Sequence, residues 1–106
     1  MTAYVIANLW DVRIGPGIVE YLERIDATLK PYEGRFLIHG AEPEVVEGTW
    51  KGVPVVVEFP DMDALRAWYD SPEYQAILPL RTDNSAGDLI VLPGVSPDHK
   101  ATDILR

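Results

Sequence analysis

Apolar residues run almost without interruption through Ala3 to Trp10, and Asn8 is the only polar residue among them. A strand with one face in water alternates apolar and polar residues. Because both parities are apolar here, the pattern predicts a strand that is covered on both faces.

A helical period follows over residues 18–29. Gly15 to Gly17 breaks the chain before it, and Pro31 and Gly34 close it. The apolar positions fall on one face of a 3.6-residue helix, and they are Ile18, Tyr21, Leu22, Ile25 and Leu29.

Three strand segments are predicted next. The first is Arg35 to His39, and the other two form a hairpin of Glu44 to Glu47 with Val53 to Phe59, turned at Trp50 to Gly52. Pro54 cannot donate to a strand ladder, so it should stand near the start of its strand.

The second half predicts an interrupted helix and a last strand. Asp61 should cap a helix whose apolar side is Met62, Leu65, Trp68 and Tyr69, and Ser71 should cap its continuation. Pro79 is expected to end or kink this helix. The last strand is Leu89 to Leu92. We therefore expect one domain over residues 1–95 and a tail over residues 96–106.

This order of elements predicts an α+β fold, a ferredoxin-like β-α-β-β-α-β sandwich with an antiparallel sheet. Its helices cover only one face of the sheet, yet the strands are apolar on both parities. The bare face would be a large apolar patch for a monomer. A homodimer that packs sheet to sheet with two-fold symmetry would cover it.

Composition narrows the function classes. The 106 residues carry 9 basic and 17 acidic side chains, a formal net charge of −8, and no cysteine. The acidic balance argues against nucleic acid and anionic membranes as partners. The missing cysteines exclude disulfides, thiolate metal sites and cysteine nucleophiles. No signal peptide is evident, so we expect a cytoplasmic protein.

Two side chains are candidates for acid–base chemistry. His39 is the only histidine within the predicted domain, and it could accept or donate a proton near neutral pH. Its spacing to Glu42 gives two ligands, too few to predict a metal site. Glu58 lies in an apolar strand. If it has no partner there, burial raises its pKa and it could act as a base. Otherwise it is a structural group, and its candidate partners are Arg35, His39, Arg81 and Asn8.

Trp68, Tyr69 and Tyr74 form an aromatic cluster near a helix junction. Such a cluster is either core or the flat wall of a pocket. Arg81 would either hold a ligand carboxylate or offset the dipole at a helix end.

Ordered short motifs give a family resemblance. They are Tyr4-Val5-Ile6-Ala7, Gly34-Arg35-Phe36-Leu37, Val46-Glu47-Gly48 with Trp50, Val57-Glu58-Phe59-Pro60, Trp68-Tyr69, Ser71-Pro72-Glu73-Tyr74-Gln75 and Leu80-Arg81. Over residues 4–95 the chain resembles domain-of-unknown-function family 1330, within the dimeric α/β-barrel superfamily. The resemblance implies a ferredoxin-like protomer and a homodimer, and it implies no particular reaction.

The chain also departs from that pattern. Arg13 to Gly17 stands where such proteins often carry Asp-Pro, and His39 stands where arginine is expected. A role that needs a guanidinium at this position is therefore in doubt.

We therefore expect a pocket between sheet and helices for a small aromatic or carboxylate-bearing molecule. Its expected lining is Asn8, Arg35, His39, Glu58, Trp68, Tyr69, Tyr74 and Arg81. As an enzyme it would carry out cofactor-independent proton transfer or oxygenation, with Glu58 or His39 as base. The alternative is a non-catalytic binding or stress-associated module in which Glu58 is structural. We predict no metal and no cofactor, since His39 on a short strand is a poor haem ligand.

Overall fold

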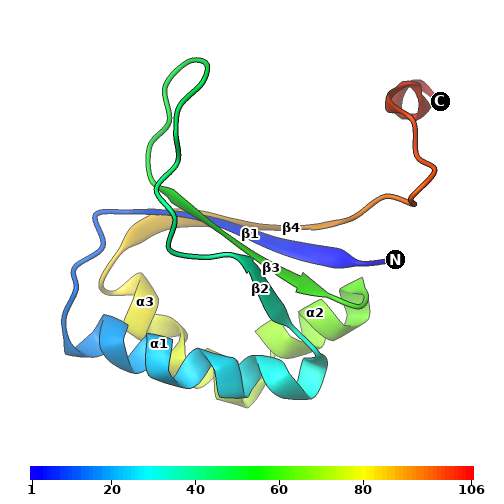
Figure 1. Ribbon diagram of the computed structural model, residues 1–106. Coiled ribbons are helices and arrows are strands. Elements are labelled where there is room, and N and C mark those ends of the chain that lie inside the picture. The colour runs from blue at the N-terminus through cyan, green and yellow to red at the C-terminus, as the bar shows by residue number, and fades with distance from the viewer.

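The computed structural model describes residues 1–106 as one antiparallel sheet with helices on a single side (Figure 1). The strands are β1 (Ala3–Trp10), β2 (Arg35–Ile38), β3 (Val53–Phe59) and β4 (Ala86–Pro93). They lie in the order β2-β3-β1-β4, and every neighbouring pair is antiparallel.

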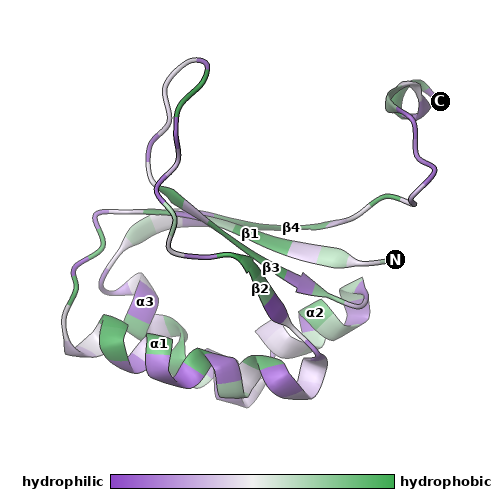
Figure 2. Cartoon of the chain, in the orientation of Figure 1, coloured by the Kyte–Doolittle hydropathy of each residue, from purple (hydrophilic) through white to green (hydrophobic).

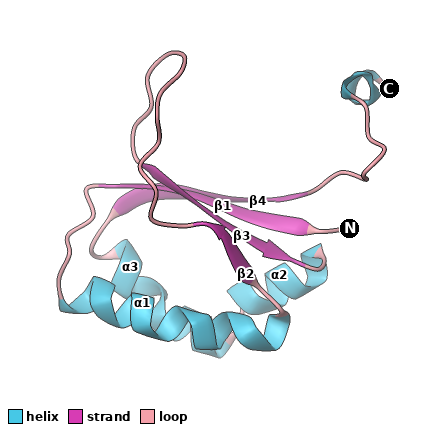
Figure 3. Ribbon diagram, viewed as in Figure 1, coloured by secondary structure: helices cyan, strands magenta, loops and turns pink.

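The helices are α1 (Pro16–Leu29), α2 (Met62–Tyr69) and α3 (Pro72–Thr82), with short 3-10 turns at Lys30–Tyr32 and Ala101–Leu105. All three α-helices cover the same face of the sheet (Figure 3). This arrangement confirms the predicted α+β, ferredoxin-like fold. None of the helices combines the length and apolar character that crossing a bilayer requires.

The strand register divides the sheet residues between two faces. Val5 pairs with Val57 and Ala3 with Phe59, and all four are buried under the helices. Residues one position along point the other way, because side chains alternate along a strand. Figure 2 shows that apolar residues dominate β3, whereas the helices carry mixed apolar and polar residues.

The face of the sheet opposite the helices is bare, and we call it the open face. Its centre is the neighbouring row Ile6, Val56 and Ile90, flanked by Tyr4 and Leu92. Ile90 is 54% exposed. The chain alone therefore leaves apolar sheet surface in water, as the two apolar parities predicted.

The predicted hairpin is wrong in one of its strands. Residues 44–47 form no strand, and β3 pairs with β2 instead. Glycines with positive φ at Gly40 (91°), Gly48 (74°) and Gly52 (99°) turn the chain repeatedly. Residues 39–52 therefore form a long loop that projects from the sheet (Figure 1), with Val46 88% exposed.

Of the two outcomes expected at Pro79, an end or a kink, the end is wrong, because α3 continues to Thr82. Proline lacks a backbone N–H donor, and its ring crowds the carbonyl four residues earlier. The last turn is held in other ways: the backbone N–H of Asp83 donates to the Pro79 carbonyl at 2.9 Å, and the Asn84 side chain donates to the Leu80 carbonyl at 2.8 Å.

Both predicted N-caps are confirmed. The Asp61 carboxylate accepts from the Ala64 N–H at 2.8 Å, and the Ser71 hydroxyl accepts from the Tyr74 N–H at 3.2 Å. Alanine at either position should lower the free energy of unfolding by about 1 kcal/mol, because one helix donor loses its partner. Urea denaturation measures this, with exposed Thr49→Ala as control. Midpoints equal to that of the control would contradict the assignment.

Candidate functional site

A cavity of about 320 Å³ lies between the helix-facing side of the sheet and helices α1 and α3. Sixteen of its 20 lining residues are hydrophobic. The sheet supplies small and branched side chains such as Ala7, Val55 and Leu89, and α1 supplies Ile18 and Ile25. A cavity of this size and lining is typical of sites for small organic molecules.

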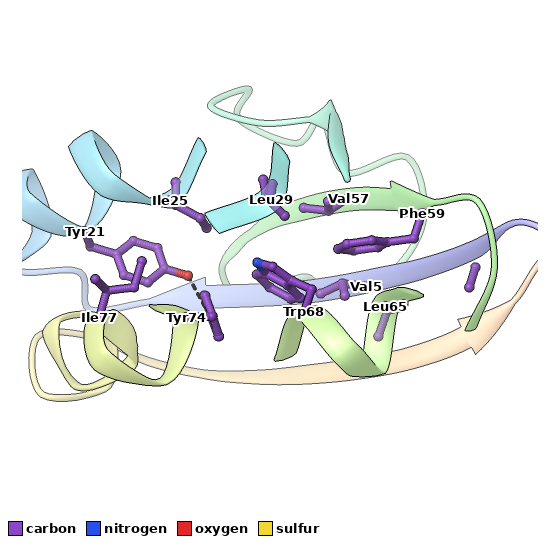
Figure 4. Close-up of a cluster of buried hydrophobic side chains, with 11 residues drawn as sticks. Val5, Tyr21, Ile25, Leu29, Val57, Phe59, Leu65, Trp68, Tyr74 and Ile77 are labelled. Atoms are coloured by element: carbon purple, nitrogen blue, oxygen red, sulfur yellow. Dashed lines mark hydrogen bonds between the residues drawn. The ribbon is translucent and has the colours of Figure 1, made fainter. Parts of the chain in front are cut away.

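Two tyrosines meet within this cavity. The hydroxyl oxygens of Tyr21 on α1 and Tyr74 on α3 are 2.7 Å apart, joined by the dashed line in Figure 4. Either oxygen can be the donor. Burial, and then the neighbouring Tyr74, raises the pKa of Tyr21 far above its usual value. The Tyr21 hydroxyl therefore keeps its proton at neutral pH.

Arg81 lies beside this tyrosine pair. Its guanidinium carbon is 5.9 Å from the centre of the Tyr21 ring. Its Nε is buried and has no hydrogen-bond partner. Burial alone would lower the pKa of Arg81, but Tyr74 and Tyr21 raise it overall, so the side chain stays charged.

Trp68 forms one wall of the cavity and is 1% exposed. Its indole N–H donates to the Thr28 hydroxyl at 3.0 Å, and Thr28 donates to the Ile25 carbonyl at 2.6 Å. Its ring centre lies 4.1 Å from that of Tyr74 and 5.3 Å from that of Phe59. These contacts fix the wall in place (Figure 4).

Four of the eight predicted pocket residues line this cavity, and they are His39, Trp68, Tyr74 and Arg81. His39 is exposed and stacks on Phe36, with ring centres 4.4 Å apart, so it stands at the mouth. Tyr69 lies outside the lining and packs against Tyr74 at 5.5 Å between ring centres.

The other three predicted residues, Asn8, Arg35 and Glu58, do not share the cavity. Glu58 stands between Val57 and Phe59, which point to the helices, so its own side chain points to the open face. There it forms an ion pair with Arg35. The structure therefore does not bring all eight residues together in this cavity.

Asn8 serves a local contact. It pairs with Pro54 and Asp88 across the sheet, and its side-chain amide donates to the Lys51 carbonyl. It therefore fastens the end of the long loop to β1, on the side away from the cavity.

Sequence reasoning missed Tyr21, which it assigned only to the apolar face of α1. The sequence signal that could have identified it is its polar phenol hydroxyl. A buried tyrosine hydroxyl usually needs a partner, and a tyrosine among isoleucines on a core-facing helix indicates a second polar group opposite. The sequence could not show that this group was Tyr74.

Fold and cavity together define a ferredoxin-like α+β protein with a ligand-sized apolar cavity between sheet and helices. The chain belongs to the family described as "Domain of unknown function (DUF1330)", which matches residues 2–95. The resemblance inferred from the sequence is thereby confirmed. No curated protein matches the chain.

Solved structures share the fold. A protein of unknown function from Rhodopseudomonas palustris has a TM-score of 0.68 at 14% identity, covering 91% of this chain and 84% of that one. A dimeric ferredoxin-like protein of unknown function from Jannaschia sp. CCS1 has a TM-score of 0.66 at 14% identity, covering 89% and 100%. SnoaB from Streptomyces nogalater, described as a cofactor-independent oxygenase, has a TM-score of 0.55 at 14% identity, covering 93% and 96%. At these identities the likeness establishes the fold alone.

Proposed function

We propose that the protein is a homodimer that binds a small, mainly apolar organic molecule in the cavity of each protomer. The observation that carries this proposal is the cavity itself, about 320 Å³ with mostly hydrophobic walls and polar groups from Tyr21, Tyr74 and Arg81. Apolar walls supply affinity through buried area, and a few polar groups set orientation.

The shape of the chain supports the dimer. Its radius of gyration is 15.2 Å, against about 13 Å for a compact chain of this length. The long loop and the C-terminal tail both leave the sheet on the side away from the helices (Figure 1). They flank the open face, where a second copy would bury apolar surface. The structure from Jannaschia sp. CCS1, described as dimeric, has the same fold.

If the cavity is catalytic, His39 would be its general base. It is the only histidine among the lining residues, and histidine is the side chain most often used for proton transfer. At the mouth it could take a proton from a bound ligand without a cofactor. The cytoplasmic location expected from the sequence stays part of this proposal.

Binding can be tested with 2-naphthamide, a neutral aromatic probe, by methyl NMR. Shifts should appear at Ile18, Ile25 and Val57, which line the cavity. Val55→Phe should abolish them by filling the cavity. Val56→Phe, the same change on the open face, should leave them in place. Shifts that survive Val55→Phe, or no shifts with any probe, would overturn the proposal.

The alternative is a non-catalytic module in which Glu58 is structural, and the Arg35–Glu58 ion pair favours it. The Arg35 side chain is 71% exposed and that of Glu58 is 21% exposed. Glu58→Gln should therefore cost about 0–1 kcal/mol in an unassociated chain, well below the cost for a buried pair. Urea denaturation across protein concentrations measures this. A loss of several kcal/mol only where the protein is dimeric would show that the pair is buried between protomers.

A further inference from the structure

The cavity is lined by a charged side chain, Arg81, that no carboxylate of the protein compensates. The chain has 17 acidic residues, yet none of them lines the cavity. Arg81 lies there without an ion-pair partner, and its Nε is sealed from solvent without a hydrogen bond. A partly buried charge is costly unless a partner compensates it.

Helix capping does not explain Arg81. It lies in the last turn of α3, where a cation offsets the helix dipole. However, the carbonyls of that turn already have partners, since Asn84 donates to Leu80 and the Ser85 hydroxyl donates to the Arg81 carbonyl at 2.8 Å. The guanidinium is therefore not needed as a cap of α3, and its charge is favoured by the neighbouring Tyr74 and Tyr21.

Each polar side chain beside it can donate a hydrogen bond. The two tyrosine hydroxyls carry two protons, and their mutual hydrogen bond uses only one. The indole N–H of Trp68 is committed to Thr28. One hydroxyl proton therefore remains for a ligand, beside an arginine that has no carboxylate partner. This group of residues matches a negatively charged hydrogen-bond acceptor.

Burial gives the direction of binding. Tyr74 is fully buried and Tyr21 is 8% exposed, whereas the exposed lining residues include Val12, Ile14, Leu22, His39 and Gly40. The tyrosine pair is thus the most buried part of the lining, whereas His39 stands at its exposed rim. The stretch between them is apolar.

We propose that the ligand is an aromatic or apolar carboxylic acid that binds with its carboxylate inward, on Arg81 and the Tyr21–Tyr74 pair. The apolar body then lies between α1 and the sheet, and its far end reaches His39. This inference rests on the proposed function, because it specifies the ligand of the same cavity. It also explains how a protein of net charge −8 could select an anion: the attraction is local and shielded from the acidic surface.

The test compares 2-naphthoate with 2-naphthamide, which differ by a carboxylate against a neutral amide of similar shape. Dissociation constants are measured by titration calorimetry on the wild type, Arg81→Met and the control Arg66→Met. Arg66 is an exposed arginine of α2 outside the cavity lining. The wild type and Arg66→Met should bind naphthoate at least about tenfold more tightly than naphthamide.

In Arg81→Met the preference for naphthoate should disappear while naphthamide binding changes little. A wild type that binds both probes equally, or an Arg81→Met variant that keeps the preference, overturns this inference and leaves the cavity proposal standing. Failure of both probes on the wild type overturns the cavity proposal itself. Naphthamide binding to Arg81→Met also shows that the variant is folded.

Discussion

Replacing Trp68 with alanine is expected to lower the free energy of unfolding by about 3–5 kcal/mol. The indole is 1% exposed and packs on both Phe59 and Tyr74. Its removal opens a void at the centre of the core and leaves the Thr28 hydroxyl without its donor. Urea denaturation followed by circular dichroism measures the change, because it does not depend on tryptophan fluorescence.

The matched control is Trp50→Ala, since Trp50 is 57% exposed in the long loop. At protein concentrations too low for association, the free energy of unfolding of this variant should stay within about 0.5 kcal/mol of that of the wild type. Equal losses in the two variants would mean that Trp68 is not the core residue described here. A Trp68→Ala protein that is folded but binds no 2-naphthamide would show that the indole is also a necessary wall of the site.

Ile90→Glu is expected to convert the proposed dimer to monomers. Ile90 lies beside Ile6 at the centre of the open face. In a sheet-to-sheet dimer, two-fold symmetry would bury two unpaired carboxylates there, and the dimer dissociation constant should rise about 100-fold or more. Sedimentation velocity at micromolar concentration measures the mass of each variant.

Val19→Glu provides the control for this change. Val19 is 45% exposed on α1, on the opposite side of the molecule from the open face, so its replacement should leave the dimer intact. A wild type that sediments as a monomer over the whole micromolar range would refute the dimer. An Ile90→Glu protein that remains dimeric would place the interface on another surface.

Half of the predicted pocket residues could be identified from the sequence by residue type, but their arrangement in space could not. The sequence marked His39, Trp68, Tyr74 and Arg81, which share the cavity. It also marked Glu58, Arg35 and Asn8, which lie on the other face or edge of the sheet. The type of a residue determines what chemistry its side chain can do. Whether a strand side chain lies on the cavity side depends on whether the helices cover the odd or the even positions of that strand.

Local signals determined the elements. The helical period over residues 18–29, the two caps and the apolar strand Ala3 to Trp10 correspond to α1, the starts of α2 and α3, and β1. Such features depend on neighbours a few residues away, so a single sequence can specify them. Residues at both odd and even positions of β1 are apolar, so both faces of the sheet are apolar. Because the helices of this fold cover only one face, the sequence also indicated that the other face would be left bare.

Only the tertiary structure decided the rest. The partner of β3 is β2 across a long loop, because glycines with positive φ carry the chain away where Val45-Val46 had indicated a strand. The Tyr21–Tyr74 hydrogen bond joins residues 53 positions apart. The uncompensated charge of Arg81 depends on which carboxylates lie near it in space. These are long-range packing outcomes, and no local pattern of hydrophobic and polar residues encodes them.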